Sequence, residues 1–229
     1  MDKILAAGSR SLSASQIGLE VTARNISQSS APGYRREVFS FEAAALGPLS
    51  RLQTDTRMGS VAPSDSPLDL AIEGNGFFLV EMNGGQFLTR SGQFARGVDG
   101  TLVGSSGQLL LDEVGAPISV NSSDVEILPN GTILDRGSPV ARIALVVPTE
   151  PSALRAVGGT LFEATATMPA DLADSQIRQR ALEGSNVETA AEMTSMMLAL
   201  RMAESGARLV QTYDGLMGQA ITALGRGLR

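Results

Sequence analysis

The last forty or so residues contain a heptad repeat, and this repeat limits the possible folds more than any other feature of the sequence. Alternate steps of three and four residues reach apolar side chains at all positions but one: Met193, Met196, Leu200, Ala203, Ala207, Val210, Asp214, Met217, Ile221 and Leu224. A helix from Ser185 to Leu224 would be about 55 to 60 Å long. A compact domain formed by 229 residues cannot bury such a helix completely. The repeat therefore predicts a coiled-coil seam that packs against other helices.

The start of this helix has a capping signature. Ser185 and Glu188 have the S-x-x-E spacing in which a hydroxyl and a carboxylate each accept a hydrogen bond from a backbone N–H. Further along, Gly206, Gly215 and Gly218 each weaken a helix by about 1 kcal/mol relative to Ala. We therefore expect the helix to begin at Ser185 and to depend on neighbouring helices for its stability.

A second helical pattern covers about residues 2–28. Its large apolar side chains recur every seventh residue, at Leu5, Leu12, Leu19 and Ile26. A stripe of mostly short side chains between Ile4 and Val21 runs beside them and would let another helix approach closely. Pro32 and Gly33 then end the pattern. The two terminal helices are expected to pair, and their weakly hydrophobic seams favour assembly among several copies.

Composition excludes several function classes. The net charge is −6 and the basic residues are scattered, so nucleic acid is not an expected partner. The absence of Cys and His excludes disulfides, thiolate metal sites and histidine-based catalysis. The first residues do not resemble a secretory signal peptide, and no window has the roughly 20 apolar residues of a membrane span. No cofactor or metal is expected.

The middle of the chain has the pattern of a β-rich unit. Asn83-Gly84 and Asn130-Gly131 each separate two runs of β-forming residues, as in β-hairpins. The alternation from Val140 to Val147 predicts one largely buried strand. Residues 165–175 are expected to form a surface link to the last helix.

Three motifs stand at the two ends and in the middle of the chain. The first comprises Asn25, Pro32, Gly33, Tyr34 and Arg35. The second comprises Gly74, Gly76, Phe77 and Phe78. The third comprises Ser185, Asn186, Val187, Glu192 and Met193. They resemble the TPGF/Y-K/R, G-x-GFF and SNV-x-x-x-x-EM signatures of the axial proteins of the bacterial flagellar rod and hook, with Gln28 and Ser30 where that family commonly has Asn.

Pattern and resemblance together predict an α+β fold. Long N- and C-terminal helices would pair as an axial coiled-coil domain, with a β-rich central domain inserted between them. The expected boundaries are 1–36 for the N-terminal axial helix, 37–58 for a linker, 59–181 for the β-rich outer domain and 182–229 for the C-terminal axial helix.

The resemblance implies a structural protein rather than an enzyme. The chain would be a basal-body rod subunit that polymerises with its own copies and with other rod proteins into the shaft that transmits torque from motor to hook. The short connection between Tyr34 and Gly59 favours the proximal rod type. A distal rod or hook-type protein, and a β-domain binding module on a coiled-coil stalk, stay open as alternatives. The resemblance further implies export through the flagellar type III apparatus without a cleaved signal peptide, periplasmic assembly and no membrane insertion.

The expected assembly interface consists of the seam side chains: Leu5, Leu12, Leu19, Ile26, Met193, Met196, Leu200, Val210, Asp214, Met217, Ile221 and Leu224. Asp214 is the acidic exception among them. It either faces water or pairs with a basic residue of another subunit, such as Arg10 or Arg24, and thereby fixes the register of the helices.

Overall fold

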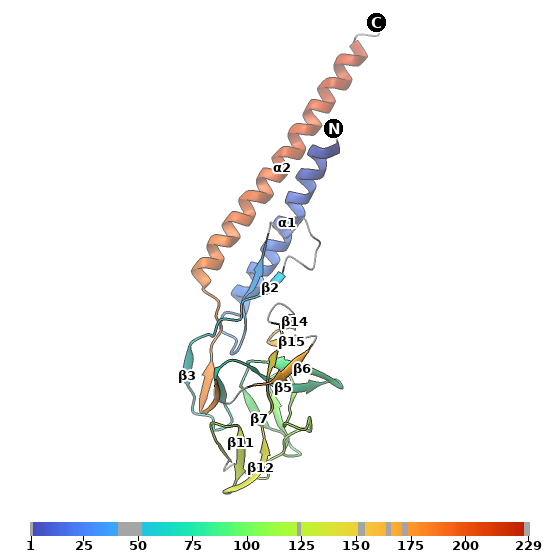
Figure 1. Cartoon of the computed structure of the whole chain (residues 1–229). Helices are drawn as coiled ribbons and strands as arrows, with labels where there is room; N and C mark the ends of the chain where they lie inside the picture. The colour runs from blue at the N-terminus through green and yellow to red at the C-terminus, as the bar shows by residue number, and fades with distance from the viewer. Residues whose placement is uncertain are drawn as a thin grey trace. The chain divides into compact units, whose positions relative to one another are not determined.

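The structure is a computed structural model that describes residues 2–40, 52–122, 125–150, 154–163, 166–170 and 174–226. The helices in this part of the chain are α1 (Asp2–Ser27) and α2 (Thr189–Arg226), and the remaining regular elements are strands (Figure 1). No helix among these residues is long and apolar enough to cross a bilayer.

The strands follow one another from the end of α1 to the start of α2. In chain order they are β1 (Glu37–Phe39), β2 (Leu52–Thr54), β3 (Val61–Pro63), β4 (Leu70–Gly74), β5 (Phe77–Met82), β6 (Gly85–Thr89), β7 (Phe94–Arg96), β8 (Leu102–Gly104), β9 (Leu109–Leu110), β10 (Val125–Ile127), β11 (Thr132–Asp135), β12 (Ser138–Arg142), β13 (Leu145–Pro148), β14 (Arg155–Gly158), β15 (Leu161–Glu163), β16 (Thr167–Pro169), β17 (Ser175–Gln179) and β18 (Ala181–Glu183).

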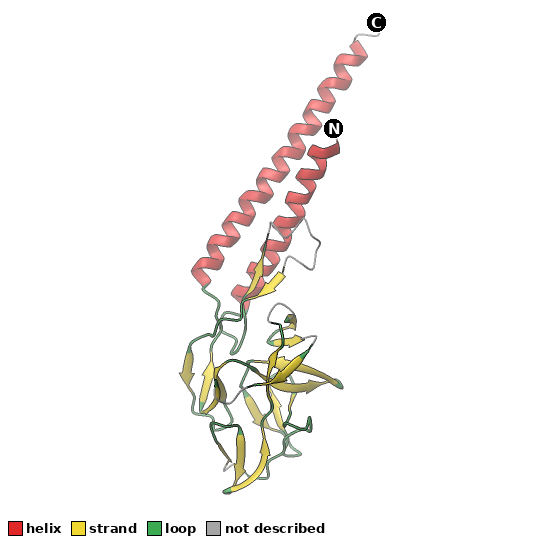
Figure 2. Ribbon diagram, in the orientation of Figure 1, coloured by secondary structure: helices red, strands yellow, loops and turns green. Residues whose placement is uncertain are grey.

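The chain forms two compact units, each assembled from separate segments. The helical unit comprises Met1–Ser27, Glu37–Leu52 and Glu188–Arg229. The strand unit comprises Gln28–Arg36 and Gln53–Val187. Figure 2 shows the two helices in red and the strands in yellow.

The predicted α+β fold with a central β-rich insertion is therefore wrong. The strand unit is not one central segment, because Gln28–Arg36 belongs to it and Glu37–Leu52 returns to the helical unit. The physical reason is a contact of the early segment: the N–H of Gly33 donates a hydrogen bond to the carbonyl oxygen of Glu183 at 2.7 Å. A segment expected to end the first helical domain is instead packed among strands.

The strand unit is built around a nine-stranded antiparallel sheet. Its main path runs β14-β15-β6-β5-β9-β8-β7, and β13 joins β5 to β16. Smaller sheets pair β10-β11-β12, β17-β4 and β18-β3. Phe78 and Leu110 from the large sheet, Ile133 from the three-stranded sheet and Ile72 from β4 are fully buried in one continuous core. This shared core makes the sheets one body.

Both predicted hairpins are confirmed. β5 pairs with β6 across Asn83-Gly84, and β10 pairs with β11 across Asn130-Gly131. The single strand predicted from Val140 to Val147 is wrong, because it divides into β12 and β13 on different sheets. Between them Ile143 N–H donates to Gly131 rather than continuing one ladder. Periodicity identified the apolar residues but not this change of partner.

The segment predicted as a surface link is also more regular than expected. Residues 165 and 171–173 lie outside the described residues, but β16 and the start of β17 fall within this stretch. β17 pairs with β4 in register, with Ile177 opposite Ile72. The chain therefore returns toward α2 as strands of the unit rather than as a loop alone.

The start of α2 differs from the predicted capping box. The helix begins at Thr189, and its first described backbone hydrogen bond runs from the N–H of Glu192 to the carbonyl of Glu188. The hydroxyl of Ser185 accepts a hydrogen bond from the N–H of Val187, two residues on. Residues 184–188 are not helical.

Candidate assembly site

Small residues bring α1 and α2 into close contact within the helical unit. A Cβ atom added at Gly206 would lie 3.2 Å from Cγ of Leu12, and one added at Gly8 would lie 3.0 Å from Cγ2 of Val210. At the other end of the pair, Asn25 contacts Glu192. Increasing residue numbers on α1 thus meet decreasing numbers on α2, so the helices are antiparallel (Figure 1).

The seam that α2 presents to α1 is shifted from the predicted one. A row of buried and half-buried positions still follows steps of three and four residues: Glu192, Met196, Ala199, Ala203, Gly206, Val210, Tyr213 and Met217. Ser195 and Ala207 are half-buried beside this row. Of the eight predicted positions with described side chains, four are retained and four move back by one residue, for example from Leu200 to Ala199. Ala199 is 3% exposed whereas Leu200 is 48% exposed. Close approach of two helices requires the smaller side chain in the contact.

The predicted interface residues consequently fall into three groups. Leu12, Leu19, Ile26, Met196, Val210 and Met217 are half-buried within the subunit. Three others on α2 are exposed: Met193, Leu200 and Asp214. The remaining three lie on the helices with side chains outside the described ones: Leu5, Ile221 and Leu224. Arg24, one of the suggested partners of Asp214, forms an ion pair with Glu37 of its own chain at 2.9 Å.

α2 also has a second apolar stripe, beside the seam that it presents to α1. Leu209 borders both, because its Cδ2 would lie 3.5 Å from a Cβ atom added at Gly8. Leu198, Met202, Leu209 and Leu216 are 56, 37, 42 and 60% exposed. With Ser205 and Thr212 they follow the same steps of three and four residues, so they lie along one side of the helix. The exposed large apolar side chains of the described part of α1 and α2 all belong to α2. We call Leu198, Met202, Leu209 and Leu216 the outer stripe.

Arg35 of the first motif belongs to a buried cluster of charges within the strand unit. The carboxylate of Glu183 is fully buried, contacts the guanidinium of Arg35, and accepts hydrogen bonds from Arg90 at 3.0 Å and from the N–H of Gly59 at 2.9 Å. The Arg35 contact is ionic, without the alignment of a hydrogen bond. Burial lowers the pKa of Arg90 to about 10, so this side chain stays charged at neutral pH. Two buried cations thus share one buried anion.

Gly33 lies where no other residue fits. Its φ of +72° is in the left-handed region, and an added Cβ would lie 2.2 Å from the backbone of Arg90 and Ser91. The next residue, Tyr34, is 2% exposed. The motif therefore has a packing role in this structure.

The middle motif forms a tight turn and part of the core. Gly74 and Gly76 both have positive φ, at +107° and +111°, and a Cβ added at Gly74 would lie 1.9 Å from a backbone oxygen. The rings of Phe77 and Phe78 pack edge-to-face with Phe162 and Phe94 at centroid distances of 5.8 and 5.5 Å. The predicted strand after the glycines is present as β5.

Two asparagines of the motifs form several hydrogen bonds each. Asn25 is fully buried in the helical unit, where its side chain donates to the Glu37 carbonyl and accepts from the Glu37 N–H. Asn186, in the strand unit, accepts from the Arg36 N–H at 2.7 Å and donates to the carbonyl of Asp55 at 3.0 Å. The Arg57 side chain lowers the pKa of Asp55 by hydrogen bonding to it.

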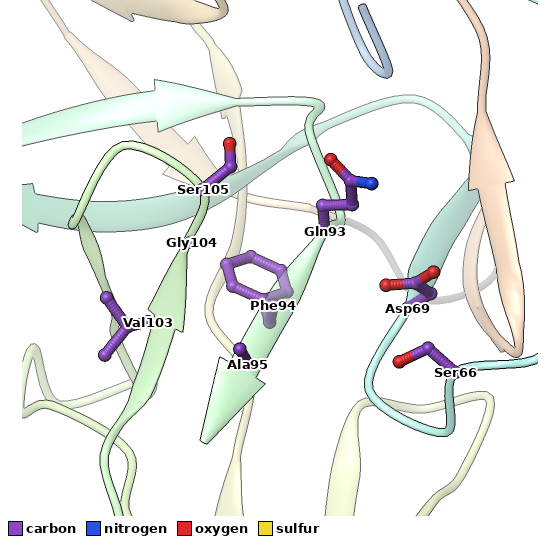
Figure 3. Close-up of a pocket in the computed structure, with 8 residues that line it drawn as sticks. All are labelled: Ser66, Asp69, Gln93, Phe94, Ala95, Val103, Gly104 and Ser105. Carbon is purple, nitrogen blue, oxygen red and sulfur yellow. The ribbon is translucent and has the colours of Figure 1, made fainter. Parts of the chain in front are cut away.

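A separate depression on the strand unit has a volume of about 350 Å³ (Figure 3). It is lined by Ser66, Asp69, Gln93, Phe94, Ala95, Val103, Gly104 and Ser105. Its one carboxylate, that of Asp69, already accepts a hydrogen bond from the hydroxyl of Ser64. Among the described residues, no three acidic side chains gather in a way that could hold a metal ion. The depression offers no second ionisable group with which Asp69 could share a proton.

Comparison with known proteins agrees with the motifs. Residues 178–223 match the family model described as flagellar basal body rod FlgEFG protein C-terminal, and residues 71–134 match the flagellar hook protein FlgE/F/G D1 domain. The basal-body rod protein FlgF of Caulobacter vibrioides is 30% identical over 225 residues, which cover 91% of this chain and 92% of that protein. The chain belongs to the flagellar rod and hook family.

Two further relatives bear on the type of rod protein. FlgF of Rhizobium meliloti is 31% identical over 179 residues, covering 74% of this chain and 72% of that protein. The basal-body rod protein FlgG of Caulobacter vibrioides is 26% identical over 247 residues, covering 90% and 93%. The resemblance to the rod and hook family is thus confirmed across most of the chain, and within Caulobacter vibrioides the identity is higher to FlgF than to FlgG.

Sequence reasoning missed some residues of this rod and hook protein that matter most in the structure. No role was assigned from the sequence to Glu183, Arg90 or Glu37. For Glu183 and Arg90 the available signal was a single charge among apolar or small residues, and such a charge does not reveal burial.

Gly33 and Gly137 offer a matched test of the motif's packing. Both have positive φ, but nothing lies within 4 Å of a Cβ added at Gly137. Gly137→Ala should destabilise the strand unit by about 1 to 2 kcal/mol through backbone strain alone. Gly33→Ala should cost about 4 kcal/mol or more, because it adds a clash with fixed backbone. Equal losses of melting temperature in thermal unfolding would show that Gly33 is needed only for its φ.

The helix contact has its own matched pair. Nothing lies within 4 Å of a Cβ added at Gly215, whereas Gly206 faces Leu12. Gly215→Leu should stabilise α2 by about 1 kcal/mol through helix propensity. Gly206→Leu should instead destabilise the pairing by about 1 to 3 kcal/mol through overpacking. Circular dichroism during thermal unfolding measures both, and stabilisation by Gly206→Leu would contradict the observed contact.

Proposed function

We propose that this chain is a structural subunit of the bacterial flagellar basal-body rod, of the proximal type. In this role it polymerises with its own copies and with other rod proteins into the drive shaft that transmits torque from motor to hook. Family membership supports the basal-body location and the structural role. The identity of 30% to FlgF and 26% to FlgG of the same organism, Caulobacter vibrioides, supports the choice among rod types.

The observation that carries the proposal is the outer stripe of α2. A helix usually buries one apolar side, and α2 already places one seam against α1. The outer stripe adds a second heptad pattern, with four large apolar side chains between 37 and 60% exposed. An exposed row of this kind marks a surface that binds protein. Helices of neighbouring subunits are the partners that fit a heptad spacing.

The contacts of a shaft must also be able to continue indefinitely. From Ala6 onward, where the side chains of α1 are described, its exposed residues are small or polar and include no large apolar counterpart to the outer stripe: Ala6, Ala7, Ser9, Arg10, Ser13, Gln16, Glu20, Ala23, Arg24 and Ser27. Large side chains of one helix can pack against such small ones on another subunit. This pairing joins two different surfaces, and such heterologous contacts produce open helical polymers.

The other predicted interface residues remain part of the proposal. Met193 and Leu200 are exposed on α2 beside the α1 seam and are available to neighbours. Asp214 is exposed, so both of its proposed states, solvated or paired with a basic residue of another subunit, remain proposals. We further propose export through the flagellar type III apparatus without a cleaved signal peptide, followed by periplasmic assembly, as the family resemblance implies.

Charge substitutions on the outer stripe test the proposal. Leu198→Asp and Leu216→Asp should abolish incorporation into basal bodies and motility, because a charge buried without a partner costs several kcal/mol. The isolated subunit should keep its helicity and melting temperature, since both side chains are more than half exposed. Incorporation is measured by labelling the subunit in purified basal bodies.

Gln211→Asp is the matched control, because it adds the same charge at an exposed position of α2 outside the stripe. It should be incorporated normally. Normal incorporation of the Leu variants, or an equal defect in the Gln211 variant, would contradict the assignment of the stripe as the assembly surface.

A further inference from the structure

The chain passes between its two units after Ser27, Arg36, Leu52 and Val187. These covalent connections are a route by which force on one unit reaches the other. Single connections of extended chain are flexible unless their backbone groups are bound. The hydrogen bonds at the ends of the connections therefore decide how firmly each unit holds them.

In the strand unit, one side chain binds the ends of three connections. The Asn186 side chain accepts from the N–H of Arg36, the last residue before the second crossing. Its NH₂ group donates to the carbonyls of Asp55 and Arg57, just after the third crossing, at 3.0 and 2.8 Å. Asn186 itself is one residue from the fourth crossing. The backbone adds a hydrogen bond from the Asp55 N–H to the Arg36 carbonyl at 2.8 Å.

In the helical unit, Asn25 has the corresponding position. It lies near the first crossing and binds both backbone groups of Glu37, the first residue after the second crossing, at 2.8 and 3.0 Å. Its NH₂ group also donates to the carboxylate of Glu192, in the first turn of α2, at 3.1 Å. Arg24 adds an ion pair to the side chain of Glu37. Asn25 thus binds the ends of the connections within its own unit.

We propose that Asn25 and Asn186 act as two clamps, each of which fixes the connecting segments where they enter its unit. Mechanical load is then carried by hydrogen-bonded backbone rather than by unbound extended chain. An asparagine amide suits this role because it offers an acceptor and two donors in one plane, as a peptide group does. Asp lacks the donors, and Ser cannot reach several partners at once. The claim that the clamps carry mechanical load rests on the proposed function. The claim that they fix the connecting segments does not.

Hydrogen exchange on the full chain tests the Asn186 clamp. Asn186→Ala should speed exchange of the Arg36 and Asp55 amides by about tenfold or more, because both lose direct or neighbouring hydrogen bonds. Amides of β5 and β6, in the core of the same unit, should be unchanged. Asn25→Ala should have the same effect on the Glu37 amide. Unchanged exchange at these amides, or an equal rise throughout the core, would overturn the proposal.

A second variant distinguishes clamping from general stability. Asn186→Asp keeps the acceptor for the Arg36 N–H but loses both donors to Asp55 and Arg57. It should leave Arg36 protected while trypsin cleaves after Arg57, whose side chain is 77% exposed, at least several-fold faster. Cleavage after Arg178, on β17, serves as the internal reference. Loss of protection at Arg36 in this variant, or unchanged cleavage after Arg57, would contradict the separate roles proposed for the acceptor and the donors of the Asn186 side chain.

Asn130→Ala is the matched control, because Asn130 also binds a backbone N–H, that of Thr132, but far from any crossing. It should change exchange at Thr132 only.

In cells, the double variant of Asn25 and Asn186 should form rods that rotate normally at low load and fail at high load. Normal rotation at high load would overturn the load-bearing part even if exchange rises. Absence of the wild-type chain from rods would refute the proposed function without affecting the exchange result.

Discussion

The buried carboxylate of Glu183 is the interaction on which the arrangement of this chain depends. It meets the guanidinium groups of Arg35 and Arg90 and the amide of Gly59, so it joins three stretches that are far apart in the sequence. A buried charge that loses its partner destabilises a protein by about 3 to 5 kcal/mol. The segment that follows α1 is consequently held among the strands, and the chain must return to the helical unit afterwards.

In the helical unit, small side chains at the contact between α1 and α2 determine which surfaces of α2 remain exposed. Gly8 and Gly206 let α1 and α2 approach closely, and Ala199 is buried in place of Leu200. Because the intramolecular seam uses small residues, the larger side chains of the outer stripe remain exposed. The pairing with α1 thus uses one seam of α2, and the outer stripe proposed for assembly lies next to it, with Leu209 bordering both.

Local chemistry predicted much of the fold. Asn-Gly pairs identified both hairpins, and the end of α1 agrees within one residue with the predicted position. Heptad stepping identified the paired helices, but it weighted Leu200 above Ala199 because hydrophobicity alone cannot show that backbones approach closely. The buried roles of Glu183 and Arg90 could not be predicted, since both depend on contacts across more than ninety residues of sequence. The hydrogen bonds of Asn25 and Asn186 also depend on residues distant in the sequence, so the sequence identified these two asparagines only as family motif residues.

A double-mutant cycle between Arg35 and Glu183 tests the central claim most directly. In a Tyr213→Phe background Tyr34 is the sole tyrosine of a chain without tryptophan, and it is buried in the strand unit. Its fluorescence during urea unfolding therefore reports on this unit. Arg35→Met and Glu183→Gln should each destabilise the unit, and their effects should differ from additivity by about 1 to 3 kcal/mol. Additivity within about 0.5 kcal/mol would contradict the claim that this ion pair holds the early segment among the strands.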